Sequence, residues 1–155
     1  MITLQHNKFL DKQTCLNLIE KFKLYKNKTI KFRNRFLLRL NDVNDILFYE
    51  IKNYYDKFFL NILSDTYLRN IELVYWERGE YHNEHIDTPY YDYTIITNLN
   101  ENFIGGRTYV KKEEITPITG KMIMFDSSLP HRVSKVEDGE RYTLIAWYNK
   151  KYNKN

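Results

Sequence analysis

The chain has 155 residues, of which 43% are hydrophobic and 28% are charged, and its formal net charge is +4. This composition is typical of a soluble globular domain and excludes a disordered or fibrous chain. No apolar run approaches the roughly 20 residues of a membrane-spanning helix, and the N-terminus lacks the pattern of a secretory signal.

The first predicted element is a short amphipathic helix near the N-terminus. Asp11 is a typical N-cap residue, because its carboxylate can accept hydrogen bonds from the free N–H groups of a first helical turn. Beyond it, Cys15, Leu18, Ile19 and Phe22 recur at helical spacing. The sequence therefore predicts a helix that buries this apolar face.

A basic stretch overlaps and follows this helix. It contains aromatic residues, no acidic residue and eight basic ones: Lys21, Lys23, Lys26, Lys28, Lys31, Arg33, Arg35 and Arg39. A cationic surface with aromatic residues could attract an acidic substrate or nucleic acid. The alternative interpretation is a solvated face in a lysine-rich chain.

Two further elements are predicted before the middle of the chain. The segment from Thr29 to Leu40 is rich in β-branched and aromatic residues separated by polar ones, which predicts one or two strands. A second helix is expected after it, with Asn41 or Asp42 as the N-cap and an end near Ser64. Its apolar stripe is expected to contain Leu47, Ile51, Tyr54 and Phe58. We expect both helices to form a supporting layer.

From Leu68 onward the pattern changes to short apolar or alternating runs separated by turn signals, among them Arg78-Gly79 and Gly105-Gly106. Many short strands at this spacing predict an antiparallel sandwich or barrel. We expect one domain over residues 1–155, with a helical support over about 1–64 and a β-core over about 67–149. The tail from Asn149 to Asn155 is expected to be a frayed polar end.

His85-Ile86-Asp87 places two potential metal ligands two positions apart. On a strand, such side chains lie on the same face, so an imidazole and a carboxylate can converge on one ion. His131, which follows Pro130 at the head of a predicted strand, is the leading candidate for a third ligand. Two histidines and one carboxylate form the facial triad of non-haem Fe(II) oxygenases, although zinc accepts the same ligand types.

Arg141 follows His131 by ten residues, so the two strands of a hairpin could carry both side chains into one pocket. A guanidinium there would bind one end of a dicarboxylate while the metal binds the other end. The alternative is a surface arginine at the start of a strand.

Several further motifs accompany these residues in the chain. They are Tyr75, Gly79 and Tyr81 before the metal motif His85-Ile86-Asp87-Thr88-Pro89, Leu99-Asn100 followed by Gly105-Gly106, Gly120 to Phe125, Pro130 to Val133, and the strand from Arg141 to Tyr148. In this order and spacing, the stretch from about Glu72 to Tyr148 resembles the prolyl 4-hydroxylase-like branch of the Fe(II)- and 2-oxoglutarate-dependent oxygenases.

The resemblance implies an α+β, mainly β fold, the double-stranded β-helix or jelly roll. It implies that His85, Asp87 and His131 bind Fe(II), that Arg141 binds 2-oxoglutarate and that Tyr75 helps to orient this co-substrate. It also implies decarboxylation of 2-oxoglutarate to succinate and CO2, coupled to hydroxylation of a C–H bond, with ascorbate as a candidate reductant.

Three residues are candidates for lying near the substrate. Tyr91 and Asp92 fall in a segment after the metal motif that, in the family, varies and often touches substrate. Trp147 occupies the position where a nucleic-acid demethylase of the same superfamily would carry a second arginine. This difference argues against a nucleic-acid substrate.

Arg33 and Arg35 are two further candidates, from the basic stretch. If they alternate onto one face of a strand, they form a cationic rim beside the metal, with Phe32 and Phe36 pointing the other way, toward the core. Such a rim would favour a substrate with acidic residues near the hydroxylated position.

We therefore expect a dioxygenase that hydroxylates a peptidyl residue, with proline as the leading candidate. A free amino acid or another small molecule is the alternative substrate, and a non-catalytic metal-binding β-barrel is the rival outside the enzymes. We expect a monomer with a protein or peptide partner, and no nucleic-acid or membrane partner. The single cysteine, Cys15, permits no internal disulfide and favours a cytoplasmic location. The bias toward residues with AT-rich codons is typical of a phage or viral genome or of a small bacterial genome.

Overall fold

The computed structural model describes residues 2–151, which form two α-helices, two short 3-10 helices and thirteen strands. The helices are α1 (Lys12–Leu24) and α2 (Ile46–Phe59), and the 3-10 helices are Lys26–Lys28 and Leu40–Asp42. The strands are β1 (Ile2–His6), β2 (Ile30–Phe32), β3 (Arg35–Arg39), β4 (Thr66–Trp76), β5 (His82–His85), β6 (Tyr93–Asn98), β7 (Phe103–Gly105), β8 (Thr108–Val110), β9 (Glu113–Ile115), β10 (Met122–Asp126), β11 (His131–Val133), β12 (Val136–Gly139) and β13 (Arg141–Lys150). Among the described residues, no helix is long and apolar enough to cross a membrane.

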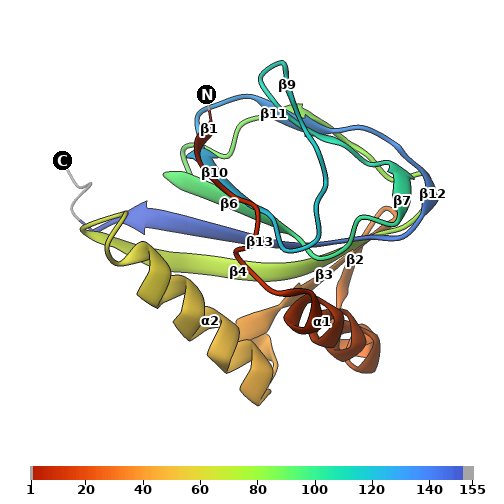
Figure 1. Ribbon diagram of the computed structural model, residues 1–155, viewed down its shortest axis with the longest axis horizontal. Coiled ribbons are helices and arrows are strands. Elements are labelled where there is room, and N and C mark those ends of the chain that lie inside the picture. Colours follow the sequence, from red (N-terminus) through yellow and green to blue (C-terminus); the bar gives the residue numbers. More distant parts are fainter. Residues whose placement is uncertain (1, 152–155) are drawn as a thin grey trace.

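The larger layer is an antiparallel sheet of seven strands in the order β1-β10-β6-β13-β4-β3-β2. Its longest strands, β4 and β13, lie side by side at the centre and pair from Arg141–Trp76 to Lys150–Thr66. Figure 1 shows α1 and α2 together on one face of this sheet, with the remaining strands arching over the other face. The helices therefore form the supporting layer that the sequence predicts.

The opposite layer is a sheet of four strands in the order β5-β11-β8-β9, and β12 pairs separately with β7. From β4 onward the chain passes repeatedly between the layers, because β4, β6, β10 and β13 belong to the larger sheet while β5, β8 and β11 belong to the smaller one. Two facing antiparallel sheets connected in this way form a double-stranded β-helix. The predicted fold class is confirmed.

Alternation along β4 and β13 separates a structural face from a face that lines a cavity. Leu73 on β4 and Leu144 on β13 are fully buried in the core beneath the helices. Their neighbours Val74 and Ile145 lie on the opposite face and line a cavity between the two layers. Since successive residues of a strand point to opposite sides, the same two strands serve both purposes.

The first helix agrees with its prediction. The Asp11 carboxylate accepts a hydrogen bond from the backbone N–H of Thr14 at 2.7 Å, which satisfies one of the free donors of the first turn. The buried residues of α1 are Cys15, Leu18, Ile19 and Phe22, as the helical spacing predicts.

The second helix differs in its start and in its buried face. Its N-cap is Asp45, whose carboxylate accepts from the N–H of Leu47 at 2.9 Å, whereas Asn41 and Asp42 lie in the 3-10 turn before it. Its buried residues are Phe48, Ile51, Tyr55 and Phe59. Ile51 is confirmed, whereas the other three predicted residues, Leu47, Tyr54 and Phe58, each precede the buried residue by one position. Apolar residues surround most of this helix, and its period alone did not identify the inward face.

Two further predictions concern the segment between the helices and the C-terminal tail. The predicted strands between Thr29 and Leu40 are present as the hairpin of β2 and β3. The expected frayed tail begins later than Asn149, because β13 runs to Lys150. Residues 152–155 of that tail lie outside the described residues.

Candidate metal and co-substrate site

The three predicted metal ligands meet at the edge of the smaller sheet. His85 ends β5 and His131 begins β11, and these strands pair so that the two histidines are cross-strand partners. Asp87 lies two residues beyond β5, where its backbone N–H donates to the carbonyl of Ser127 at 2.8 Å. Residues far apart in the sequence are therefore positioned together by backbone pairing.

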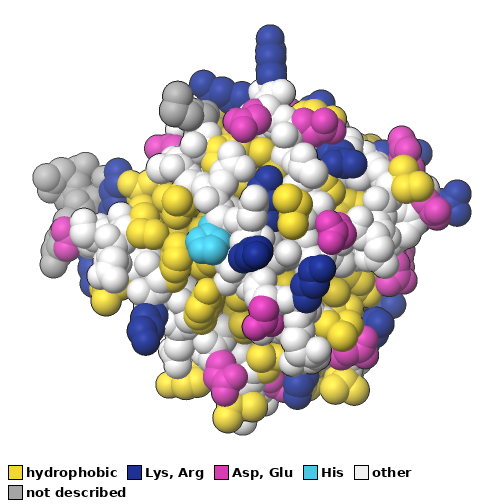
Figure 2. Space-filling view, viewed as in Figure 1, with side chains coloured by type: hydrophobic (Ala, Val, Ile, Leu, Met, Phe, Trp, Pro, Cys, Tyr) yellow, Lys and Arg dark blue, Asp and Glu magenta, His cyan; other side chains and the backbone are white. Residues whose placement is uncertain are grey.

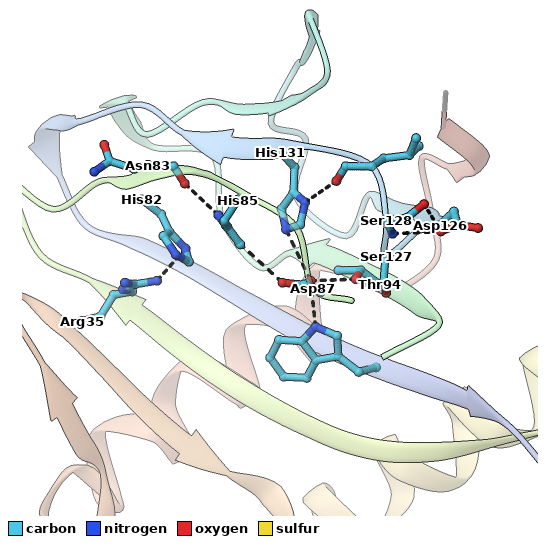
Figure 3. Close-up of polar contacts among 12 residues, drawn as sticks. Arg35, His82, Asn83, His85, Asp87, Thr94, Asp126, Ser127, Ser128 and His131 are labelled. Atoms are coloured by element: carbon cyan, nitrogen blue, oxygen red, sulfur yellow. Dashed lines mark hydrogen bonds and ion pairs between the residues drawn. The ribbon is translucent and has the colours of Figure 1, made fainter. Parts of the chain in front are cut away.

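The donor atoms of this triad are close enough to share one ion. One ligand atom from each of His85, Asp87 and His131 lies within 4.8 Å of the other two. Asp87 Oδ1 lies 3.5 Å from His85 Nε2, and Asp87 Oδ2 lies 3.4 Å from His131 Nε2 (Figure 3). Two imidazoles and one carboxylate on one side leave several positions open, which fits a divalent metal that also binds exogenous ligands.

Backbone carbonyls orient both imidazole rings. His85 Nδ1 lies 2.7 Å from the carbonyl oxygen of Asn83, and His131 Nδ1 lies 2.9 Å from that of Leu129. A carbonyl oxygen can only accept, so both Nδ1 atoms donate, and the Nε2 atom of each ring lies on the side of Asp87. Burial lowers the pKa of His85, which favours the neutral ring that a metal requires.

Two donors hold the Asp87 carboxylate in place. Thr94 Oγ1 donates to Oδ2 at 2.8 Å, and Trp147 Nε1 donates to the same oxygen at 3.1 Å. Burial alone would raise the pKa of Asp87, but the contact with His131 and these two hydrogen bonds hold the pKa at about 2. The carboxylate is therefore ionised at neutral pH, with Oδ1 left for a metal.

Arg141 is fully buried in the same cavity and has two nitrogens without a partner. Its Nη2 donates to Thr108 Oγ1 at 2.9 Å, whereas Nε and Nη1 have no hydrogen-bond partner. Burial, followed by the charge of Arg35, lowers the pKa of Arg141 to about 9, so the guanidinium remains charged at pH 7. Because a buried, incompletely paired cation is costly, this arrangement fits an anion that brings the missing acceptors.

Gly106 explains part of the Gly105-Gly106 motif. Its φ is +57°, and a Cβ there would lie 3.1 Å from Arg141 Cδ and 3.1 Å from Val136 Cγ2. A side chain at this position would therefore press on the arginine that the motif accompanies.

The triad and Arg141 line one cavity of about 210 Å³ between the two sheets. Its wall is completed by residues from β3, β4, β5, β6, β11 and β13: Arg35, Leu37, Glu72, Val74, Trp76, His82, Thr94, Ile96, Val133, Ile145 and Trp147. The expectation that His131 and Arg141 sit on one hairpin was wrong, because β11 and β13 belong to different sheets. The two residues reach the same cavity from facing layers.

Tyr75 lies outside this cavity, contrary to its predicted role. Its ring stacks on Tyr142 at 4.9 Å on the helical side of the sheet, and its hydroxyl donates to Glu140 at 3.3 Å. The next residue, Trp76, faces the cavity instead, and its ring lies under the Arg141 guanidinium at 4.5 Å. Neighbouring residues of a strand point to opposite faces. Tyr75, which the resemblance assigns to the co-substrate, therefore points to the helical side, whereas Trp76 points into the cavity.

The other substrate-proximal candidates lie at different distances from the site. Trp147 lines the cavity and donates to Asp87. Tyr91 stacks on the Trp147 ring at 4.9 Å but is not part of the cavity wall. The Asp92 carboxylate accepts a hydrogen bond from the backbone N–H of Lys150 at 2.8 Å and does not line the cavity. The structure therefore brings Trp147, and through it Tyr91, to the site.

The predicted rim of Arg33 and Arg35 does not form as expected. Arg33 lies in the turn between β2 and β3 with a φ of +58°, and only Arg35 is a strand residue. Phe32 pairs directly with Arg35 across the hairpin, so it shares the cavity side of the sheet and is 56% exposed. Only Phe36 packs against the core, because the turn interrupts the alternation on which the prediction depended.

Half of the charge in the basic stretch is neutralised locally, because its five paired cations share four carboxylates. Five of its eight basic side chains, Lys21, Lys23, Arg33, Arg35 and Arg39, form ion pairs with acidic residues. Figure 2 shows basic and acidic side chains interspersed over the face that it presents, without a patch of a single sign. These observations favour the interpretation of the stretch as a solvated, internally paired surface.

Comparison with solved structures supports the fold. The chain is similar to a prolyl-4-hydroxylase from Pseudomonas putida, with a TM-score of 0.80 and 17% identity over 95% of this chain and 91% of that one. It is also similar to a prolyl hydroxylase from Trichoplax adhaerens in complex with a hypoxia inducible factor peptide fragment, with a TM-score of 0.77 and 17% identity over 96% of this chain and 83% of that one.

Comparison of the sequences identifies the family. A PKHD-type hydroxylase of Prochlorococcus marinus (strain NATL2A) is 34% identical over 80 residues, which cover 44% of this chain. The match spans only 36% of that relative's length. Residues 71–149, which contain the triad and Arg141, match the family model of the 2OG-Fe(II) oxygenase superfamily. The chain belongs to the 2OG-Fe(II) oxygenase superfamily.

Proposed function

We propose that this protein is an Fe(II)- and 2-oxoglutarate-dependent dioxygenase that hydroxylates a peptidyl residue, with proline as the expected residue. The observation that carries the proposal is a triad of His85, Asp87 and His131 in one cavity with a buried arginine that lacks two partners. When bound, Fe(II) and 2-oxoglutarate would activate dioxygen, of which one oxygen atom converts a C–H bond to C–OH and the other enters the succinate that is formed together with CO2.

The side chains of the cavity have separate roles in this proposal. His85, Asp87 and His131 would hold the metal through Nε2, Oδ1 and Nε2, respectively. Arg141 Nε and Nη1 would bind the far carboxylate of 2-oxoglutarate, while Thr108 keeps Nη2 oriented. Thr94 and Trp147 would keep the Asp87 carboxylate facing the metal. Outer hydrogen bonds of this kind commonly support metal ligands.

The unpartnered nitrogens of Arg141 also argue against a non-catalytic barrel. A barrel used only for recognition would gain stability by replacing a buried, half-satisfied cation with an apolar residue. An anionic ligand that completes the hydrogen bonds of Arg141 would explain a buried arginine at this position.

The proteins of similar fold support a peptide substrate. The compared structures are prolyl hydroxylases, and one of them holds a peptide fragment. The Trichoplax protein and this chain share their fold over 96% of this chain. On this basis we extend peptidyl hydroxylation to this protein.

One observation favours the small-molecule alternative. Glu72 lines the cavity and is only 8% exposed, and burial raises the pKa of its carboxyl. One carboxylate oxygen accepts from Asn70 at 2.9 Å and lies 3.6 Å from Arg39 Nε. A desolvated carboxylate favours a substrate that brings a hydrogen-bond donor, such as the amino group of a free amino acid.

The test is turnover with defined components. The purified protein is incubated with Fe(II), 2-oxoglutarate, ascorbate and either proline-containing peptides or free amino acids, and succinate is measured. A hydroxylated product gains the mass of one oxygen atom. Succinate formation coupled to that gain supports the proposal and separates the two substrate classes, whereas no conversion of 2-oxoglutarate under any condition contradicts it.

A further inference from the structure

His82 lines the cavity and has no role in the function proposed above. It lies on β5, three residues before His85, and is half-buried. Figure 3 shows Arg35, His82 and His85 in a row that leads to Asp87. The contacts along this row connect the β2–β3 hairpin to a metal ligand.

The row is anchored by Glu80, which is fully buried. Its Oε1 lies 2.9 Å from Arg33 Nη2 and accepts from the N–H of Tyr81 at 3.0 Å, while its Oε2 accepts from Arg35 Nε at 3.3 Å. A buried carboxylate is stable only when its oxygens are paired, so Glu80 holds Arg35 in this position.

Arg35 in turn determines the state of His82. Its Nη1 lies 2.9 Å from His82 Nδ1. Arginine can only donate, so Nδ1 carries the lone pair and the ring proton is on Nε2. Because Arg35 donates to the lone pair of His82 Nδ1, this nitrogen is not available as a fourth metal ligand.

The neutral ring of His82 lies flat against the ring of His85. Their centroids are 3.7 Å apart and their planes differ by 19°. His131 needs no such support, because its side chain is 6% exposed and its ring lies 4.9 Å from that of Phe125. The His85 side chain is 27% exposed, so fewer neighbours restrict its rotation.

We infer that His82 is a positioning residue, held by Arg35 and Glu80, whose ring fixes the plane of the His85 imidazole for metal binding. The inference rests on the proposed function, because it needs a metal at the triad. Partners of metal ligands commonly contribute about 10- to 100-fold to metal affinity.

The test measures binding of Co²⁺ to the full chain without 2-oxoglutarate, by titration calorimetry and by the visible absorption of the bound ion. His82→Gln keeps an acceptor for Arg35 but removes the ring, whereas His82→Phe keeps a flat ring but removes the acceptor. His6→Gln is the matched control, because His6 contacts Phe9 and Phe58 and does not line the cavity. The melting temperature of each metal-free variant shows whether the fold is retained.

We expect His82→Gln to weaken Co²⁺ binding by about 10-fold or more and to change the absorption bands. His82→Phe should bind with an affinity between those of His82→Gln and the wild type, and His6→Gln should match the wild type. Wild-type affinity and absorption in His82→Gln, or equal losses in His82→Gln and His82→Phe, overturn the inference. A wild-type protein that binds no Co²⁺ contradicts the proposed function itself, which distinguishes the two failures.

Discussion

The two faces of the β4–β13 pair differ in whether the protein itself supplies all packing and hydrogen-bond partners of their side chains. On the helical face, Leu73 and Leu144 are fully buried among apolar neighbours. On the cavity face, Arg141 is fully buried and leaves two nitrogens without a hydrogen-bond partner. The protein itself completes the packing of one face, whereas the other face leaves hydrogen-bond donors that a bound anion would satisfy. Stability and function are therefore separated by alternation along the same strands.

The largest effect is expected from breaking the triad on the cavity face. His131→Ala should reduce metal-dependent turnover to background, because two ligands cannot hold the ion in the geometry of three. The melting temperature of the metal-free protein should change little compared with that loss. Turnover and thermal unfolding are measured on the same preparation, and near-normal turnover would show that His131 is not the third ligand.

A substitution on the helical face should lower stability and leave co-substrate binding unchanged. Leu144→Ala deletes a fully buried side chain, so the free energy of unfolding should fall by about 2–5 kcal/mol. The KM for 2-oxoglutarate should stay near the wild-type value, because Leu144 points away from the cavity. Denaturant unfolding and steady-state kinetics check this separation, and a large change in KM at unchanged stability would refute it.

Replacing the buried cation should trade binding for stability. Arg141→Met removes the charge-assisted contact, so the KM for 2-oxoglutarate should rise by about 30- to 150-fold, corresponding to about 2–3 kcal/mol. The free energy of unfolding should stay unchanged or rise, because an incompletely paired buried cation is replaced by an apolar side chain. Arg78→Ala, at an exposed arginine, is the control for a general loss of positive charge. An unchanged KM in Arg141→Met would exclude Arg141 from the co-substrate site.

The smallest effect is expected at the N-cap of α2. Asp45 accepts from the N–H of Leu47, pairs with Lys21 at 3.0 Å and accepts from the Tyr25 hydroxyl at 2.9 Å. Asp45→Ala should cost about 1 kcal/mol of stability at neutral pH, with turnover unchanged in the folded protein.

The pH dependence of that effect follows from the direction of the pKa shift. Burial would raise the pKa of Asp45, but Lys21, Tyr25 and the N–H of Leu47 lower it below the usual value of 3.8. The folded state therefore gains stability from the ionised carboxylate above pH 3.8, and this gain is lost as the pH falls through the lowered value. Asp45→Asn keeps the cap and removes the charge. The difference in the free energy of unfolding between the wild type and Asp45→Asn should shrink below about pH 4. A difference that grows as the pH falls would contradict a lowered pKa of Asp45.

The sequence predicts features that depend on local spacing or short motifs. Asp11 caps α1 as expected, and His85, Asp87, His131 and Arg141 meet in one cavity. The order and spacing of short motifs were sufficient to select the site residues. The expected strand geometry was not the cause for Asp87, which lies beyond the end of β5 and is positioned by its backbone hydrogen bond to Ser127.

Features that depend on register or on distant partners could not be predicted in the same way. A shift of one residue placed Tyr75 in the core and Trp76 in the cavity, and no local signal distinguishes these neighbours. The apolar stripe of α2 was displaced by one position, since only packing against β4 and β13 determines its inward side. The link from Glu80 through Arg35 to His82 joins residues 45 and 47 positions apart and is visible only in the folded chain.

The central claim is that one ligand bridges the triad and Arg141. Titration calorimetry of 2-oxoglutarate into the Mn²⁺-loaded wild-type protein, His131→Ala and Arg141→Met tests it most directly. We predict saturable binding of one molecule per chain in the wild type, and strongly weakened binding in both variants. Wild-type affinity in either variant, or binding that does not depend on the metal, would contradict this account.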